Sequence, residues 1–145
     1  MICLINLESN KTIIKEFINA TNNKDWGKLS ALVDNDFVRH SSSGTENINS
    51  REKLIKFHQE ELLVFPDSKE TIILLVEEGE FVAARLNFQG TQLGKLGPYP
   101  PSGRTLNADF NCIFRITNGK IKESWVEYDN LNGLIQLGHF NFPKE

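Results

Sequence analysis

The sequence predicts an α+β fold, in which three helices precede an antiparallel meander of strands. Two observations support this prediction. Apolar residues recur at helical spacing over the first 65 residues, and after Pro66 the pattern changes to strand-length runs separated by glycine turns. A chain of 145 residues with no linker-like or repeated segment is expected to form one domain over residues 1–145.

The helical half contains three predicted segments. Asn10 is a capping residue for a helix that runs to about residue 22, with apolar residues at positions 13, 14, 17 and 18. Asp25 begins a second, shorter helix. Ser50 precedes a third helix, which Pro66 stops. Residues 37–40 read as a short strand between the second and third helices.

The second half contains the predicted strands, which cover residues 71–76, 81–88, 105–116 and 121–129. Gly79 marks the first turn, residues 90–103 form a loop rich in glycine and proline, and Asn118-Gly119 marks a hairpin. A last helical turn is expected over residues 131–137.

Composition excludes several classes of protein. A net charge of −3 without a basic stripe argues against nucleic-acid binding, and no apolar run is long enough for a membrane span. Residues 1–8 lack the basic start of a signal peptide, so we expect a cytoplasmic protein. Cys3 and Cys112 are too far apart for a metal motif and are expected to be reduced thiols. Phosphate-binding, dinucleotide and metal-ligand motifs are absent, which predicts no cofactor.

A series of short segments resembles the SnoaL-like polyketide cyclase family. The segments are Asp36-Phe37-Val38-Arg39-His40, Phe65-Pro66-Asp67, Gly90-Thr91-Gln92-Leu93-Gly94, Pro100-Pro101-Ser102-Gly103-Arg104, the run from Phe114 to Trp125, Asp129, and Gln136-Leu137-Gly138. The resemblance covers nearly the whole chain and depends on the order and spacing of the segments. One departure is Gln92, where the family often has a histidine, because glutamine is neither an acid nor a base near neutral pH.

The resemblance implies a nuclear transport factor 2-like fold, a cone of three N-terminal helices packed on a strongly curved antiparallel or mixed sheet. It also implies a homodimer and a cavity for an apolar carbonyl ligand. Cyclases of this family close a ring by an intramolecular aldol reaction without metal or cofactor, using an aspartate as general acid/base. We expect residues 90–138 to carry the pocket.

The turn of the last hairpin decides which side chains share a face of the sheet. A two-residue turn at Asn118-Gly119 would turn Glu123 toward the face of Cys112 and Phe114, with Asp109 pointing away. A three-residue loop with a bulge would instead bring five residues to one face, namely Asp109, Asn111, Glu123, Trp125 and Asp129. We favour the second turn, because the family's cyclases place a polar residue and the catalytic carboxylate fourteen positions apart across this hairpin.

On this basis Glu123 is the candidate general acid/base, assisted by Asp109 and His40. Two carboxylates in one cavity disfavour double ionisation, which would keep one of them protonated. The candidate ligand-binding residues are Asn111, as a donor to an enolate oxygen, with Trp125, Asp129, Phe57, Phe114 and Arg85. Several of these residues also have a structural alternative. Asp109 and Glu123 would lie on the solvent-exposed face of the sheet, Arg85 would point outward, and Asp129 would cap the last helix. His58 is expected on a helix surface.

These residues predict a cofactor-free acid/base enzyme of the polyketide or ester cyclase type. A non-catalytic binding or dimerisation module with the same fold is the main alternative, favoured by Gln92. An isomerase, dehydratase or epoxide hydrolase of the same superfamily is the other.

Overall fold

A computed structural model describes residues 9–42 and 47–144. Cys3 and the apolar start of the chain lie outside these residues. The helices are α1 (Asn10–Asn22), α2 (Trp26–Leu32), α3 (Arg51–Val64) and α4 (Asn130–Gln136). The strands are β1 (Val33–His40), β2 (Lys69–Glu78), β3 (Phe81–Thr91), β4 (Thr105–Thr117) and β5 (Lys120–Glu127). No helix among the described residues is long and apolar enough to cross a membrane.

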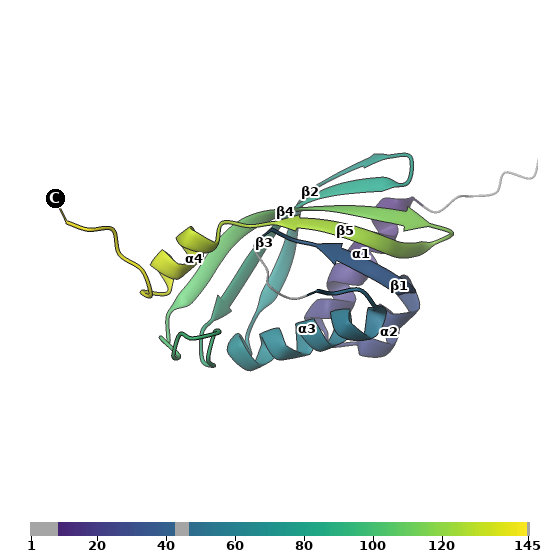
Figure 1. Ribbon diagram of the computed structural model, residues 1–145. Coiled ribbons are helices and arrows are strands. Elements are labelled where there is room, and N and C mark those ends of the chain that lie inside the picture. The colour runs from purple at the N-terminus through teal and green to yellow at the C-terminus, as the bar shows by residue number, and fades with distance from the viewer. Residues whose placement is uncertain (1–8, 43–46, 145) are drawn as a thin grey trace, which may run out of the picture.

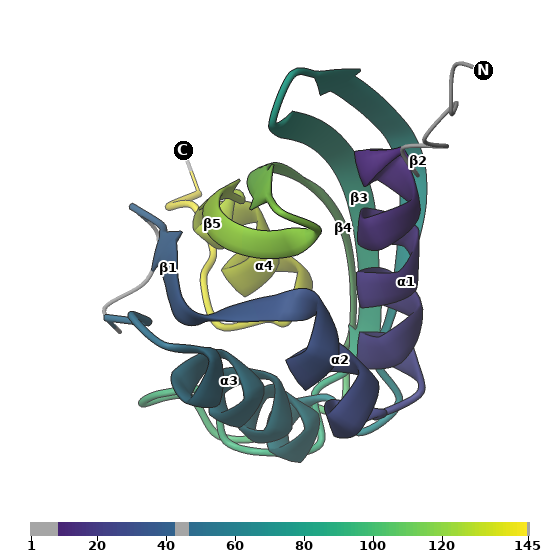
Figure 2. The same cartoon turned by 90° about the vertical axis from the view of Figure 1, so that its right-hand side faces the viewer.

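The five strands form one mixed sheet in the order β1-β5-β4-β3-β2. Neighbouring strands are antiparallel except for β1 and β5, which run parallel. The sheet curves strongly, and α1, α2 and α3 lie together inside the curve (Figures 1 and 2). The α+β class, with three N-terminal helices on a curved mixed sheet, is therefore confirmed.

Each of the three N-terminal helices begins at a side-chain cap. Ser9 Oγ accepts a hydrogen bond from the Lys11 N–H, Asp25 Oδ1 from the Lys28 N–H, and Ser50 Oγ from the Lys53 N–H. The first cap lies one residue before the predicted Asn10, whose own N–H donates to Glu77 Oε1 at 3.0 Å.

The core lies between the inner face of the sheet and the helices. Alternate residues of β3 and β4, such as Leu86 and Phe114, are buried against Ile14 and Phe17 of α1. Phe17 and Phe114 pack edge to face with ring centroids 5.8 Å apart. Cys112 is a free, buried thiol in this layer.

The β4–β5 hairpin differs from the prediction in its turn but agrees in its outcome. Asn118 and Gly119 have φ angles of 52° and 72°, and Thr117 pairs with Lys120, so the turn has two residues. A register shift between Arg115 and Ile116 then inserts one extra residue in β5. The three-residue loop was therefore wrong, while the bulge turns Glu123 and Trp125 to the same face as Asp109 and Asn111, as that loop was expected to do.

Helix α4 lies beside the part of β4 that extends beyond its partner strand. Strand β5 ends at Glu127, opposite Asn111. Past this point the Gln136 side chain accepts from the Asn107 N–H at 2.9 Å and donates to the Asn107 carbonyl at 3.1 Å. The Gln136 amide thus takes the place of a strand, and Asp129 caps the helix that carries it.

Candidate active site

The odd-numbered polar residues of the last hairpin do share a face, but it is the outer face of the sheet. The inner residues of β4 and β5, including Cys112, Phe114, Ser124 and Val126, are buried, and their neighbours point the other way. Glu123 lies opposite Arg115, six residues along β4 from Asp109. At the rise of a β-strand this places the two carboxylates roughly 20 Å apart, too far to share a proton.

Glu123 is held by two basic side chains on this outer face. Its carboxylate accepts from Arg115 Nε at 3.0 Å and contacts His40 Nε2 at 2.7 Å. The hydrogen bonds from His40 and Arg115 hold the pKa of Glu123 below its usual value, opposite to the raised pKa expected of a closed cavity. The His40 ring stacks on Trp125, with centroids 5.2 Å apart.

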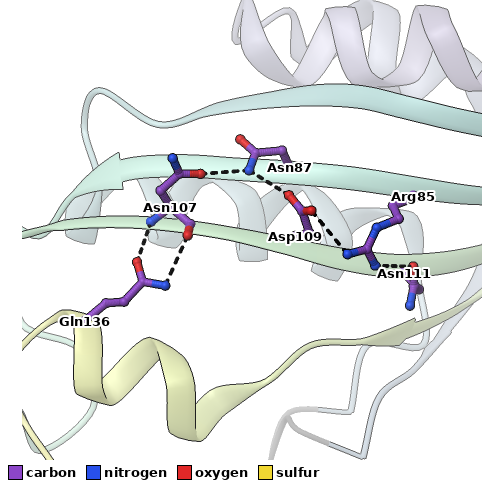
Figure 3. Close-up of polar contacts among 6 residues, drawn as sticks. All are labelled: Arg85, Asn87, Asn107, Asp109, Asn111 and Gln136. Atoms are coloured by element: carbon purple, nitrogen blue, oxygen red, sulfur yellow. Dashed lines mark hydrogen bonds and ion pairs between the residues drawn. The ribbon is translucent and has the colours of Figure 1, made fainter.

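Asp109 belongs to a separate polar row on β3 and β4, shown in Figure 3. Arg85 donates to Asp109 at 3.1 Å and to Asn111 at 3.1 Å, while Asn87 donates to Asp109 at 2.9 Å. Asn87 also donates to the Asn107 side chain at 2.8 Å. These side chains satisfy one another, so Arg85 and Asn111 lie outside the cavity in which they were expected.

The other expected ligand-binding residues are dispersed. Phe114 lies in the core, Asp129 caps α4, and Trp125 lies on the outer face against His40 and Phe81. Of these expected ligand-binding residues, Phe57 alone lies close to an inward-facing polar side chain, the guanidinium of Arg39. The structure therefore divides the expected residues between two clusters on the outer face and several separate positions, and does not bring them together in one site.

Cys112 and Val126 are fourteen positions apart in the sequence, as Asp109 and Glu123 are, but they point inward. They pair across β4 and β5 and are 3% and 7% exposed. Neither is a carboxylic acid, and burial strongly raises the pKa of the Cys112 thiol, which keeps it protonated. The hairpin therefore contributes no inward-facing carboxylate.

The inward-facing carboxylates come from α3 and β2. Glu61 and Glu70 line a small internal cavity of about 10 Å³, which has room for about one water molecule. The remaining lining residues are Thr21, Asn22, Trp26, His58, Leu62 and Ser68. None of them falls in residues 90–138, and this cavity lies where the helices meet the start of β2.

Burial makes both carboxyls unusually weak acids. It raises the pKa of Glu61 to about 8, with a further contribution from the neighbouring charge of Glu70. It raises the pKa of Glu70 to about 7. The positive charge of Arg39 opposes both shifts without cancelling them. The two groups therefore titrate near neutral pH, where general acid/base catalysis is most effective.

His58 is buried beside these carboxyls, not exposed on the helix surface as predicted. It is 8% exposed, and among the described residues neither ring nitrogen has a hydrogen-bond partner. Burial, with the charge of Arg39 as a smaller cause, lowers the pKa of His58 to about 4, so the ring is neutral. Buried polar groups normally have partners, and this unsatisfied ring indicates a place for a ligand or water.

Arg39 stands over the same interior from β1. Its guanidinium carbon lies 4.7 Å from the centre of the Phe57 ring and 5.9 Å from that of Tyr128. Its Nη2 donates to Tyr128 Oη at 3.3 Å. Strand β1 thus directs Arg39 inward and His40, the next residue, to the outer face.

Sequence reasoning missed Glu61 and Glu70, although a signal was present. In α3 the inward stripe runs through the buried Leu54 and His58 to the half-buried Glu61, so two polar residues occupy positions that the helical period assigns to the core. Glu70 precedes Ile72 by two residues and so shares its inward face of β2. The Asn22 side chain holds this strand in place by bonding both the N–H and the carbonyl of Glu70, each at 2.8 Å.

Gln92 has a structural role in this chain. It is fully buried, and its Nε2 donates to the carbonyls of Gly94 and Pro100. Its Oε1 lies 2.7 Å from His139 Nε2, and the His139 ring stacks on Tyr99. The residue that replaces the family's frequent histidine therefore ties the 92–104 loop to the C-terminal segment.

Comparison with known proteins agrees with this fold. The family model for SnoaL-like polyketide cyclase matches residues 11–137. IdmH, a proposed polyketide cyclase from Streptomyces antibioticus, is 28% identical, with a TM-score of 0.80 over 90% of this chain and 99% of its own. TsrD from Streptomyces laurentii is 25% identical, with a TM-score of 0.83 over 94% of this chain and 99% of its own.

A SnoaL-like protein from Jannaschia sp. CCS1 is 17% identical with a TM-score of 0.81, over 91% of this chain and 93% of its own, and shows the fold alone. No curated protein matches the sequence. The family model spans all the elements that build the interior, from α1 to α4. The chain therefore belongs to the SnoaL-like polyketide cyclase family.

Proposed function

We propose that the protein is a cofactor-free acid/base enzyme that enolises an apolar carbonyl compound inside the cone, as in the ring closure of a polyketide. The observation that carries this proposal is the pair Glu61 and Glu70, whose pKa values are raised to about 8 and about 7 beside the unsatisfied His58. Two carboxyls with separated pKa values can divide the roles of acid and base.

The order of ionisation assigns the roles. Glu70 ionises first and removes the proton from the carbon next to the carbonyl, and the C–H electron pair moves into the enolate. Glu61 keeps its proton longer and donates a hydrogen bond to the enolate oxygen. In a ring closure the enolate carbon then attacks a second carbonyl of the same substrate, and the new alkoxide takes a proton from Glu61.

The cavity must open to admit such a substrate, since it now has room for about one water molecule. This small volume, together with the inward pair Cys112 and Val126, favours the second candidate function, a ligand-binding module without catalysis. The two functions differ in whether a bound ketone exchanges its α-protons.

The test is deuterium exchange at the α-carbons of 2-tetralone in D₂O, followed by proton NMR. We expect the wild-type protein to accelerate exchange and the Glu70→Gln and Glu61→Gln variants each to lose on the order of a hundredfold of the protein-dependent rate. Glu123→Gln is the matched control on the outer face. Loss of exchange in Glu123→Gln with retention in Glu70→Gln would move the site to the outer face.

We also propose a homodimer formed through the outer face of the sheet. Exposed apolar side chains of β2, β3 and β4 gather there: Val76 is 54% exposed, Phe81 44% and Ile113 45%. They flank the polar row of Arg85 and Asp109. A second copy would remove this apolar surface from water.

A further inference from the structure

The Arg39 guanidinium has unused hydrogen-bonding capacity at the edge of the interior. It carries five N–H donors, and among the described residues one of them has an acceptor, the Tyr128 hydroxyl. The guanidinium also lies over the rings of Phe57 and Tyr128, which help to hold it in position. In the described part of the chain no carboxylate lies within ion-pair distance of Arg39.

The nearby carboxyls do not form an ion pair with Arg39. Glu61 and Glu70 influence Arg39 at longer range, and at neutral pH burial keeps most of Glu61 and about half of Glu70 protonated. The neutral His58 does not form one either. Within residues 9–42 and 47–144 the half-buried Arg39 guanidinium therefore has a neutral hydrogen-bond partner and no ion-pair partner, and an anion bonded to it would offset the cost of its partial burial.

A groove reaches Phe57 from the solvent side of α3. Its volume is about 360 Å³, within the range of small-molecule sites. It is lined by Asn47, Ile48, Lys53, Lys56, Phe57 and Glu60. The two lysines and one glutamate give the lining a net positive charge. Phe57 contributes to this groove and also packs against the Arg39 guanidinium.

We propose that Arg39 binds the carboxylate of an aromatic or other apolar acid whose body lies in the groove over Phe57. A carboxylate matches the planar fork of a guanidinium with two parallel hydrogen bonds. This inference rests on the proposed function for its chemistry, since it makes the substrate a carbonyl compound that also bears a carboxylate. Arg39 is then the residue that selects and positions the substrate.

The test compares two ligands of the same shape, 2-naphthoate and the neutral 2-naphthamide, by isothermal titration calorimetry at pH 7.5. We expect the wild-type protein to bind the naphthoate at least about tenfold more tightly, the ratio typical of a charge-assisted hydrogen bond. Arg39→Gln should abolish this preference while leaving naphthamide binding within about threefold, and Arg39→Lys should retain part of it.

Arg85→Gln is the matched control, since it makes the same change on the outer face and should keep the preference. Equal affinities in the wild-type protein, binding of neither ligand, or loss of the preference in Arg85→Gln alone would overturn the inference. The double variant Glu61→Gln/Glu70→Gln separates it from the proposed function. If both that variant and the wild type prefer naphthoate, and neither accelerates exchange of the 2-tetralone α-protons, the result would support the carboxylate site at Arg39. It would reject the catalytic role of Glu61 and Glu70.

Discussion

Cys112 and Val126 face each other across the β4–β5 hairpin on the inner side of the sheet. They are fourteen positions apart, as are the two catalytic residues of the family's cyclases across this hairpin, and both point inward. In this chain the two positions hold a thiol and an apolar side chain. The hairpin is therefore core, and the inward acids come from α3 and β2.

Val126→Asp tests whether this part of the hairpin tolerates a charge. Val126 is 7% exposed, so an aspartate would have to lose its hydration or remain protonated. We expect a loss of about 3 kcal/mol of unfolding free energy at pH 7 and a smaller loss at pH 4, measured by urea denaturation. Leu93→Asp, at a position 58% exposed in the 92–104 loop, should change stability by less than about 0.5 kcal/mol. A stable, unperturbed Val126→Asp would show that the inner face is hydrated.

The buried carboxyls should make the protein less stable as the pH rises. The pKa of each is higher in the folded than in the unfolded chain, so the folded state binds more protons between about pH 4.5 and pH 7 for Glu70, and pH 8 for Glu61. Their contribution is fully present below pH 4.5 and is lost through this range.

We therefore expect Glu70→Gln to raise the unfolding free energy by about 3 kcal/mol at pH 8 relative to its effect at pH 4.5. Thermal and urea unfolding across this pH range measure the difference. Glu60→Gln is the matched control, since Glu60 is exposed on α3 and pairs with Lys56. A pH profile of Glu70→Gln parallel to that of the wild type would contradict the raised pKa.

We expect the buried His58 ring to destabilise the fold while it contributes to ligand binding. Its ring nitrogens are buried without partners in the described structure, which is unfavourable. His58→Leu keeps the apolar contacts and should raise the unfolding free energy by about 1 kcal/mol at pH 7 while weakening ligand binding. In contrast, His139→Leu removes the partner of Gln92 and should lower stability. A destabilised His58→Leu would indicate that the ring has a partner.

The sequence predicted the order of elements well because local signals define it. Caps at Asp25 and Ser50 begin helices, and the glycine turns separate strands. The outer-face location of Glu123 was not predictable in this way, because it depends on a register shift between Arg115 and Ile116. An alternating strand pattern indicates that two faces differ, while the helices on the inner side decide which face is buried.

The interior acids were missed for a similar reason. Glu61 lies in a stretch of charged and polar residues, and helical polarity by itself fits an exposed face. Its burial follows from contacts with β2 and the end of α1, which are distant in sequence. The curvature of the sheet brings Glu70 and Arg39 near enough to influence the charge of Glu61, and this is a tertiary property that no local pattern encodes.

Gly94 should tolerate no side chain. A Cβ at this position would lie 2.0 Å from the Leu63 carbonyl oxygen, a contact with backbone that cannot move aside easily. We expect Gly94→Ala to cost about 3 kcal/mol of unfolding free energy by urea denaturation, with increased proteolysis of the 92–104 loop. Gly27→Ala, inside α2 with its nearest neighbour at 3.7 Å, should stabilise by about 0.5 kcal/mol. Equal effects of the two substitutions would mean that the loop does not pack on α3.

The outer face of the sheet should hold the homodimer. Ile113 follows Asp109 and Asn111 along β4, pairs with Trp125 of β5, and is 45% exposed. Ile113→Asp would place a like charge from each copy in the shared interface, where charges near a two-fold axis repel.

We expect light scattering after size exclusion to give twice the 16.5 kDa chain mass for the wild type and a monomer for Ile113→Asp. Leu63→Asp, at a position 75% exposed on α3, is the control and should remain dimeric. Because Ile113 lies on the outer face, opposite the cavity, the monomeric variant should keep its ligand binding. A wild-type monomer, or a dimer in both variants, would show that this face is not the interface.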